Sequence, residues 1–278
     1  MAEARALPIA LALVALAAAL PAAAADMRVV RDVAYGPDAR QRFDVYAPRD
    51  ARGAPVIFFV HGGGWAVGDK SNRAVVRNKT ARWVPRGFVF LSANYRMLPE
   101  ADPLEQARDV ARALAAAQAQ AASWGGDPAR FVLMGHSAGA HLVALIASAP
   151  RIALDLGARP WLGTVELDSA ALDLERIMRD RHLRLYDRAF GSDPAYWAKA
   201  SPSARLAAPG APFLAVCSTR RAESCPAARD YAAKAQALGT RASVLEENLS
   251  HREINEELGL NNDYTRAVEA FLDTLTVR

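Results

Sequence analysis

Short apolar runs alternate with longer helix-like segments through most of this chain. The runs at 55–60 (PVIFFV), 88–93 (FVFLSA) and 130–135 (RFVLMG) are continuous, as expected for strands that are buried on both faces. Several of the segments between them carry helix patterns that end at proline or glycine. This alternation predicts a mostly parallel sheet with helices on both faces, in which ligands bind at the carboxyl ends of the strands.

Five further strands complete the predicted sheet. Two partly polar strands come first, and three more are expected within 163–173, 211–219 and 241–250. The sheet should therefore contain eight strands. The insertion between the sixth and seventh strands, Leu174–Ser203, is short, so we expect a minimal lid. The 278 residues are 52% hydrophobic and 23% charged, which is ordinary globular composition, and we assign residues 26–278 to a single domain.

The first 25 residues have a different character. Arg5 precedes an apolar run, Ala6–Leu20, and a stretch of small residues ends at Ala25. This is the layout of a cleaved signal peptide, residues 1–25, so we expect a periplasmic or secreted protein. The alternative is an uncleaved membrane anchor, because the run is near the lower length limit for crossing a bilayer. No membrane span is expected after cleavage.

The two cysteines are Cys217 and Cys225. An even pair of cysteines in an exported protein typically forms a disulfide, and we predict that bond here. Two free, buried cysteines are the alternative. The spacing matches no zinc pattern, because no second Cys/His pair accompanies these residues, so no metal and no cofactor is expected.

The net charge of +4 is spread over the chain. The densest basic stretch, Arg179–Arg188, also contains two aspartates, and we interpret it as a solvated helix face. Basic residues do not form a stripe with interleaved aromatic side chains, so nucleic acid is not expected as a partner.

The segment Gly135–Gly139 reads G-x-S-x-G between a predicted strand and a predicted helix. Flanking glycines permit a sharp turn that lifts the hydroxyl of Ser137 above the sheet edge. The turn also places the N-terminus of the helix beneath the reacting atom. A plain glycine turn with a capping serine is the alternative, but the strand-to-helix context favours a nucleophile.

A serine nucleophile needs backbone donors for the developing oxyanion. The segment His61–Trp65, HGGGW, directly follows an apolar strand, and its glycines let the backbone approach a ligand closely. We expect an oxyanion hole made by the N–H groups of Gly63, Gly64 and Ala138.

With these motifs the chain resembles an α/β-hydrolase of the HGGG esterase type. It is similar to the group that includes kynurenine formamidase-like and small acetyl- or feruloyl-esterase-like enzymes. The resemblance runs from about Val29 to the C-terminus and is carried by HGGGW (61–65), NYRMLP (94–99) and GHSAGAH (135–141). It implies the α/β-hydrolase fold and a catalytic triad in the chain order serine, acid, histidine.

The base is predicted to be His251, the one histidine that follows the last predicted strand. His61, His136 and His141 belong to the two motifs, and His182 lies in the charged stretch.

The acid departs from the pattern of the resembled family, which has H-G-x-x-D after the seventh strand. Arg221 holds the position of that aspartate, and the nearest carboxylate is Glu223. We therefore predict Glu223 as the acid, in a loop that the disulfide holds near the histidine. Asp173, after the sixth strand, is the alternative, and Asp230 is less suitable because it lies well along a helix.

These residues predict a serine hydrolase that cleaves small-molecule, short-chain carboxylic esters through an acyl-enzyme. Trp65, Met97 and Trp197 are candidate walls of a shallow substrate pocket. An amidase such as an arylformamidase would use the same machinery, and a non-catalytic binding protein with this fold is the remaining alternative. The sequence predicts no particular oligomeric state.

Overall fold

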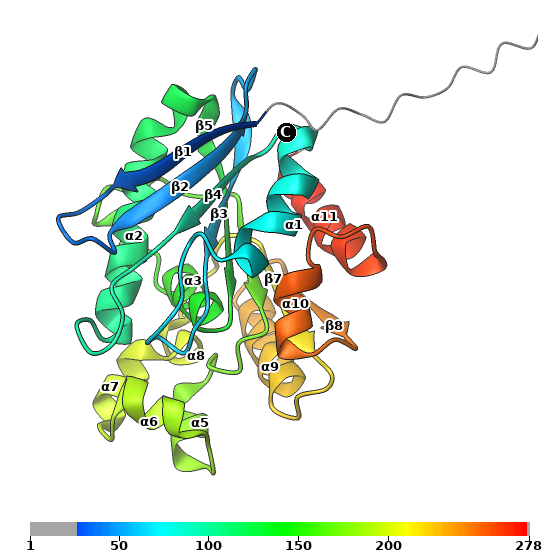
Figure 1. The fold of residues 1–278 in the computed structure, drawn as a ribbon. Helices are drawn as coiled ribbons and strands as arrows, with labels where there is room; N and C mark the ends of the chain where they lie inside the picture. The colour runs from blue at the N-terminus through cyan, green and yellow to red at the C-terminus, as the bar shows by residue number, and fades with distance from the viewer. Residues whose placement is uncertain (1–26, 277–278) are drawn as a thin grey trace, which may run out of the picture.

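An eight-stranded sheet forms the centre of the molecule in the computed structural model, which describes residues 27–276 (Figure 1). The predicted signal peptide lies outside the described residues. The strands are β1 (Met27–Ala34), β2 (Arg42–Pro48), β3 (Ala54–Val60), β4 (Val89–Ala93), β5 (Gly126–His136), β6 (Gly163–Leu167), β7 (Phe213–Ser218) and β8 (Ala242–Glu247). Their order is β1-β2-β4-β3-β5-β6-β7-β8, and the two ladders that β2 makes are antiparallel while the others are parallel. The mostly parallel, eight-stranded sheet is therefore confirmed.

The longer helices cover both faces of this sheet (Figure 1). One face packs against α1 (Arg73–Trp83), α10 (His251–Glu257) and α11 (Asp263–Thr276). The other packs against α2 (Pro103–Gln120), α3 (Ala138–Ser148) and α9 (Ser224–Ala237). Shorter elements are η1 (Val84–Arg86), η2 (Ala121–Trp124), α4 (Arg151–Leu154) and α8 (Pro202–Arg205).

Strand β3 shows why its sequence is apolar without interruption. Val56, Phe58 and Val60 belong to the core beneath α2 and α3, whereas Ile57 and Phe59 belong to the core beneath α1 and α11. All five side chains are fully buried. Successive side chains of a strand point to opposite faces, so burying both faces requires an apolar residue at every position.

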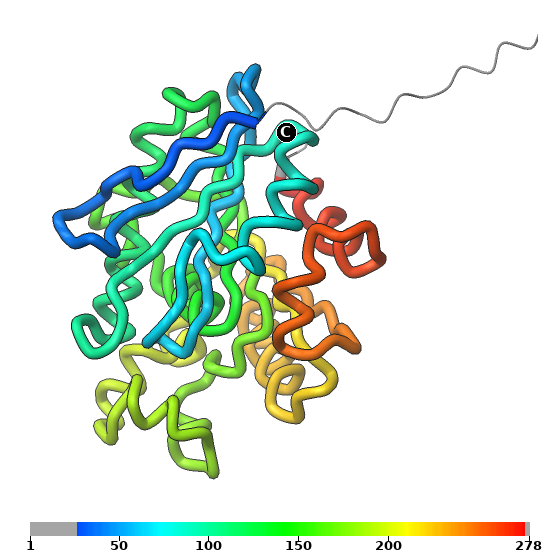
Figure 2. The backbone as a smooth tube through the Cα atoms, in the orientation of Figure 1, coloured from blue at the N-terminus to red at the C-terminus, as the bar shows by residue number. Residues whose placement is uncertain are grey.

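The insertion after β6 folds into a small cap, residues 174–203, as its length predicted. It contains α5 (Leu174–Arg179), α6 (Arg184–Phe190) and α7 (Pro194–Ala200). The backbone tube shows this cap, in yellow-green, projecting at the opposite end of the molecule from the described N-terminus (Figure 2). Within residues 27–276 no helix combines the length and the hydropathy needed to cross a bilayer.

A buried lysine fastens α10 to α1. Lys79 is fully buried, and its Nζ donates to the backbone oxygen of Asn255 at 2.6 Å and to the side-chain Oδ1 of Asn255 at 3.0 Å. The ammonium also lies 5.0 Å from the ring centroid of Phe59. Burial lowers the pKa of Lys79 to about 7. This contact holds in place the helix that begins at His251.

The lowered pKa of Lys79 predicts a specific pH dependence of stability. Between pH 7 and 10.5, the ordinary lysine value, the unfolded chain binds more protons than the folded one. The free energy of unfolding should therefore rise with pH in this window, by up to about 1.4 kcal/mol per unit. Urea titrations at pH 7, 8 and 9 should show this rise in the wild-type protein and a flatter dependence in Lys79→Met.

The exposed Lys234 provides a matched control, because no comparable burial acts on it. Lys234→Met should keep the wild-type slope. Equal slopes in wild type and Lys79→Met would mean that Lys79 is not the group responsible.

Candidate active site

A sharp turn joins β5 to α3 and presents Ser137. The backbone of Ser137 has φ 57° and ψ −119°, a conformation that is strained for a residue with a side chain. The glycines on either side are required by close packing. A Cβ on Gly135 would lie 2.4 Å from the backbone oxygen of Gly139, and a Cβ on Gly139 would lie 2.2 Å from that of Val60. The sequence of the turn thus serves to place one hydroxyl at the carboxyl end of the sheet.

Ser137 and His251 meet at this edge although 114 positions separate them. Ser137 Oγ lies 2.9 Å from Nε2 of His251. Nδ1 of the same ring lies 2.6 Å from Oδ2 of Asp168. His136 donates from Nε2 to the backbone oxygen of His251 at 2.9 Å, and burial lowers the pKa of His136 to about 3, so that ring remains neutral. The structure therefore forms a continuous hydrogen-bonded relay from hydroxyl to imidazole to carboxylate.

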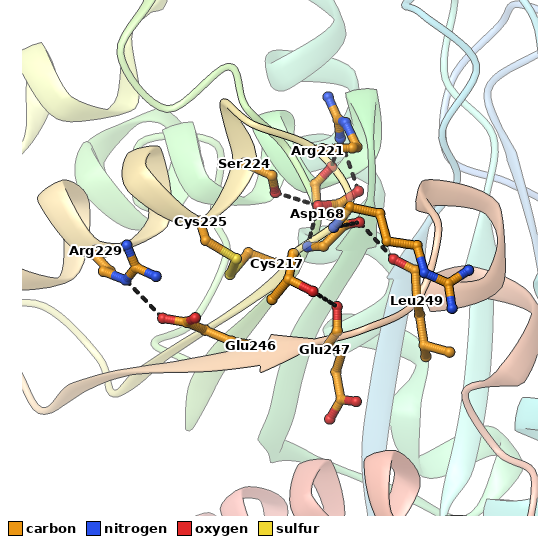
Figure 3. Close-up of a disulfide and its surroundings, with 12 residues drawn as sticks. Asp168, Cys217, Arg221, Ser224, Cys225, Arg229, Glu246, Glu247 and Leu249 are labelled. Carbon is orange, nitrogen blue, oxygen red and sulfur yellow. Dashed lines mark hydrogen bonds and ion pairs between the residues drawn. A yellow bond between two sulfur atoms is a disulfide. The ribbon is translucent and has the colours of Figure 1, made fainter.

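The carboxylate of the relay is completely buried and surrounded by donors. Asp168 directly follows β6 with φ 58°. Its Oδ1 accepts hydrogen bonds from the backbone N–H of Ser218 at 2.8 Å and from the hydroxyl of Ser224. Arg221 donates to Oδ2 at 2.8 Å (Figure 3). Burial would raise the pKa of Asp168, but the hydrogen bond with His251, the charge of Arg221 and the hydroxyl of Ser224 together lower it below its ordinary value.

The prediction of Glu223 as the acid is corrected by this geometry. Glu223 is half exposed, and its carboxylate pairs with Arg221 at 2.9 Å rather than with His251. The guanidinium of Arg221 reaches Asp168 and Glu223 with its two terminal nitrogens. Asp173 caps α5 by accepting from a backbone N–H, and Asp230 pairs with Arg176 at 2.7 Å.

Asp168 could have been found from its position in the sequence. It is the first residue after the buried sixth strand, as Ser137 is the first residue after the fifth. The resemblance to the HGGG esterases instead directed attention to the loop after the seventh strand, where Arg221 stands in place of an acid.

The glycine loop after β3 packs directly on the serine turn. A Cβ on Gly62 would lie 2.8 Å from Cβ of Ser137, and a Cβ on Gly63 would overlap the backbone oxygen of Val67. Gly64, with φ 57°, lines the cavity beside Ser137 together with Ala138. Ala138 begins α3, so its N–H has no intrahelical acceptor. Two of the three predicted oxyanion donors thus stand on the cavity wall, and Gly63 does not.

Trp65 and His141 connect the loop, the turn and the cap. Trp65 donates from Nε1 to Nδ1 of His141 at 3.2 Å, and His141 donates from Nε2 to the backbone oxygen of Ala200 at 2.8 Å. Burial lowers the pKa of His141 to about 4, which keeps the ring neutral and able to accept. Of the predicted pocket walls, Trp65 lines the cavity, whereas Met97 is buried in the core and Trp197 packs within the cap against Phe190.

The cavity at Ser137 measures about 230 Å³. Leu183, Leu185 and Tyr186 of α6 and its preceding turn close one side, and Arg221 and Glu223 stand on the polar side. A neighbouring cavity of about 410 Å³ shares Leu183, Tyr186 and Glu223 with it. Among the described residues, no group of three or more His, Cys, Asp and Glu side chains is arranged to hold a metal ion.

The predicted disulfide between Cys217 and Cys225 is confirmed, with Cα atoms 5.0 Å apart. Cys217 lies on β7 and Cys225 in the first turn of α9 (Figure 3). The bond closes the segment 217–225, called the clamp loop below. This loop carries the Asp168 donors Ser218, Arg221 and Ser224.

Solved structures with this arrangement of strands and helices include proteins that are named as esterases. A carbohydrate esterase from gut microbiota, solved in truncated form, aligns with a TM-score of 0.77 at 16% identity over 93% of this chain and 99% of that chain. Esterase B from Lactobacillus rhamnosis aligns with a TM-score of 0.72 at 18% identity over 91% of this chain and 86% of that chain. The chain has the α/β-hydrolase fold.

Sequence relatives of this chain are also named as esterases. Residues 43–156 match the model of the BD-FAE family, an esterase family of this fold. Esterase LipQ of Mycobacterium tuberculosis is 31% identical over 66% of this chain and 47% of its own length. Isoprenylcysteine alpha-carbonyl methylesterase ICME of Arabidopsis thaliana is 33% identical over 42% of this chain and 27% of its own length. The chain therefore spans about a quarter to a half of the length of these curated relatives.

The geometry predicts which carboxylate matters. Asp168→Asn should lower kcat for a short ester by about 10⁴-fold, because the imidazole loses the partner that sets its tautomer and stabilises its charged form. Glu223→Gln should keep kcat within about threefold, because the ion pair that Glu223 makes with Arg221 from the solvent side contributes little free energy. Steady-state turnover of p-nitrophenyl acetate measures both. Strong loss in Glu223→Gln with little loss in Asp168→Asn would reverse the assignment.

Proposed function

We propose that this protein is a serine hydrolase that cleaves short-chain carboxylic esters through an acyl-enzyme. The observation that carries the proposal is the relay of Ser137, His251 and Asp168 at the wall of a cavity. The names of the relatives and of the solved structures with this fold support ester bonds over amide bonds.

In the proposed mechanism Ser137 Oγ attacks the ester carbonyl while Nε2 of His251 takes its proton. Asp168 holds the ring with Nδ1–H toward its carboxylate and stabilises the imidazolium that forms. The N–H groups of Gly64 and Ala138 receive the oxyanion. His251 then returns the proton to the leaving alcohol, and a water molecule, deprotonated by the same imidazole, releases the acid from Ser137.

The size and lining of the cavity support a small acyl group. About 230 Å³ lies below the range of about 300–1,000 Å³ that is typical of drug-sized ligand pockets. Trp65, Leu183 and Leu185 offer apolar contacts. A longer acyl chain would have to pass Leu183, Tyr186 and the carboxylate of Glu223 to enter the neighbouring cavity of about 410 Å³.

We also propose that the protein is exported and belongs to the HGGG group of esterases. Export is supported by the signal-like residues 1–25 and by the disulfide, which is typical of oxidising compartments. The HGGGW motif at 61–65, whose Gly64 lines the cavity, supports the group.

Covalent labelling tests the proposed nucleophile. A fluorophosphonate probe should label the wild-type protein at one residue, and Ser137→Ala should abolish the label while keeping the same thermal unfolding curve. Absence of labelling and of ester turnover in the folded wild type would favour a binding protein without catalytic activity.

A panel of substrates tests the bond. We expect turnover of p-nitrophenyl acetate and butyrate to exceed that of the decanoate by at least about tenfold in kcat/KM, because the cavity of about 230 Å³ beside Ser137 suits a short acyl group. N-formyl aromatic amides should be poorer substrates than the acetate. Faster cleavage of the amides would identify an arylformamidase-like amidase instead.

A further inference from the structure

Arg221 contacts both the acid and the base of the proposed relay. Its Nη1 lies 2.8 Å from Oδ2 of Asp168, 3.1 Å from the backbone oxygen of Asp168 and 3.0 Å from Nδ1 of His251. Its side chain is only 21% exposed, and it lines the cavity that contains Ser137. An arginine thus stands where the resembled family would carry its acid.

The contact between Arg221 and His251 is electrostatic and is not a hydrogen bond. Nδ1 of His251 lies 2.6 Å from Oδ2 of Asp168, so Nδ1 carries a proton and donates it in a hydrogen bond to that carboxylate. Nδ1 therefore has no lone pair for the guanidinium. When His251 takes the proton of Ser137, the ring becomes a cation in contact with another cation. Arg221 thus orients Asp168 by donating to it and also opposes the charging of the imidazole.

Glu223 completes this arrangement from the solvent side. Its carboxylate accepts from Nη2 of Arg221 at 2.9 Å. The guanidinium is therefore held between a buried carboxylate and an exposed one, with 0% and 53% exposure. Glu223 acts on Arg221 and not on the imidazole.

The clamp loop fixes the position of Arg221. The disulfide joins β7 to the first turn of α9, so both ends of the loop are tied to the protein core (Figure 3). Both cysteines are buried, and the loop also supplies Ser218 N–H and Ser224 Oγ to Asp168. A loop of this length, without the cross-link, would have more freedom at its centre, where Arg221 lies.

The other titratable groups that face the Asp168–His251 pair come from several elements. They are His136 at the end of β5, Glu166 on β6, Tyr186 on α6, Glu223 in the clamp loop and Tyr264 on α11. Burial lowers the pKa of His136 and raises the pKa values of Glu166, Tyr186 and Tyr264. In each case it favours the neutral form of the group. Arg221 is therefore the cation in direct contact with the pair, and Glu223 is its counter-charge.

We propose that Arg221 is a positioning residue for the Asp168–His251 pair, that its charge sets the acid limb of the pH–rate profile, and that the Cys217–Cys225 disulfide holds it there. The proposal rests on the proposed ester hydrolase function. It assigns to Arg221 a role through the acid and base, with no bond formed to the substrate.

Variants of Arg221 separate charge from geometry. Arg221→Met should lower kcat for p-nitrophenyl acetate by about 10- to 100-fold, because a small misplacement of a catalytic group is costly. Removing the cation makes a proton easier to add to the Asp168–His251 pair, so the acid limb of kcat/KM should move to higher pH by about one unit. Arg221→Lys keeps the charge and should leave the acid limb within about 0.3 unit of wild type.

Arg229→Met is the matched control. Arg229 lies on α9 and pairs with Glu246 at 2.7 Å, away from Asp168 (Figure 3). This variant loses an arginine from the same region and should keep both kcat and the acid limb. If Arg221→Met does not fold, Arg221→Gln, which retains a donor without the charge, should show the same shift of the acid limb.

The disulfide is tested by its coupling to Arg221. Replacing Cys217 and Cys225 together by alanine should lower kcat several-fold in the wild-type background and by much less in Arg221→Met, because both changes release the same contact. Equal losses in the two backgrounds would remove the disulfide from the proposal.

The outcomes distinguish a failure of the role of Arg221 from a failure of the proposed function. An active, labelled wild type whose acid limb does not move in Arg221→Met or Arg221→Gln overturns the role of Arg221 and leaves the esterase intact. A folded wild type with no ester turnover and no fluorophosphonate label overturns the proposed function and this role with it.

Discussion

The buried carboxylate of Asp168 is the group on which the rest of the site depends. A fully buried charge is tolerated only when donors compensate for the water that it has lost. Asp168 receives those donors from the clamp loop and from His251. The same hydrogen bonds determine which oxygen faces the imidazole, and so direct the other ring nitrogen toward Ser137. The hydrogen bonds that stabilise the buried carboxylate of Asp168 thus also orient the ring of His251.

Strand register brings the serine and the acid together. Strands β5 and β6 are parallel and pair His136 with Leu167, so the next residues, Ser137 and Asp168, leave the sheet side by side. Ser137 N–H donates to the backbone oxygen of Leu167 at 3.0 Å, and Asp168 N–H donates to that of Val216 on β7 at 2.8 Å. The first residue after each of these two strands stands at the edge where His251 also lies.

Local patterns were sufficient for the sheet, the turn at Ser137 and the choice of His251 as the residue that meets it. They were not sufficient for the acid. Glu223 was favoured because it is close in sequence to the expected position, but a loop residue can face solvent or protein, and the ion pair with Arg221 keeps it outside. Met97 was misjudged for a similar reason, because its sequence context does not distinguish a pocket wall from the core.

The sequence by itself determined the order of strands and helices, the sharp bend at the serine and the cysteines of the disulfide. These depend on periodicity, on glycines without Cβ atoms and on residue type, all of which are local. Tertiary structure alone decided that Asp168 accepts the hydrogen bond from the imidazole and that Arg221 stands between two carboxylates. It also decided that Gly64 rather than Gly63 lines the cavity. Those outcomes depend on strand register and on the direction of side chains in loops, which follow from packing between segments far apart in the chain.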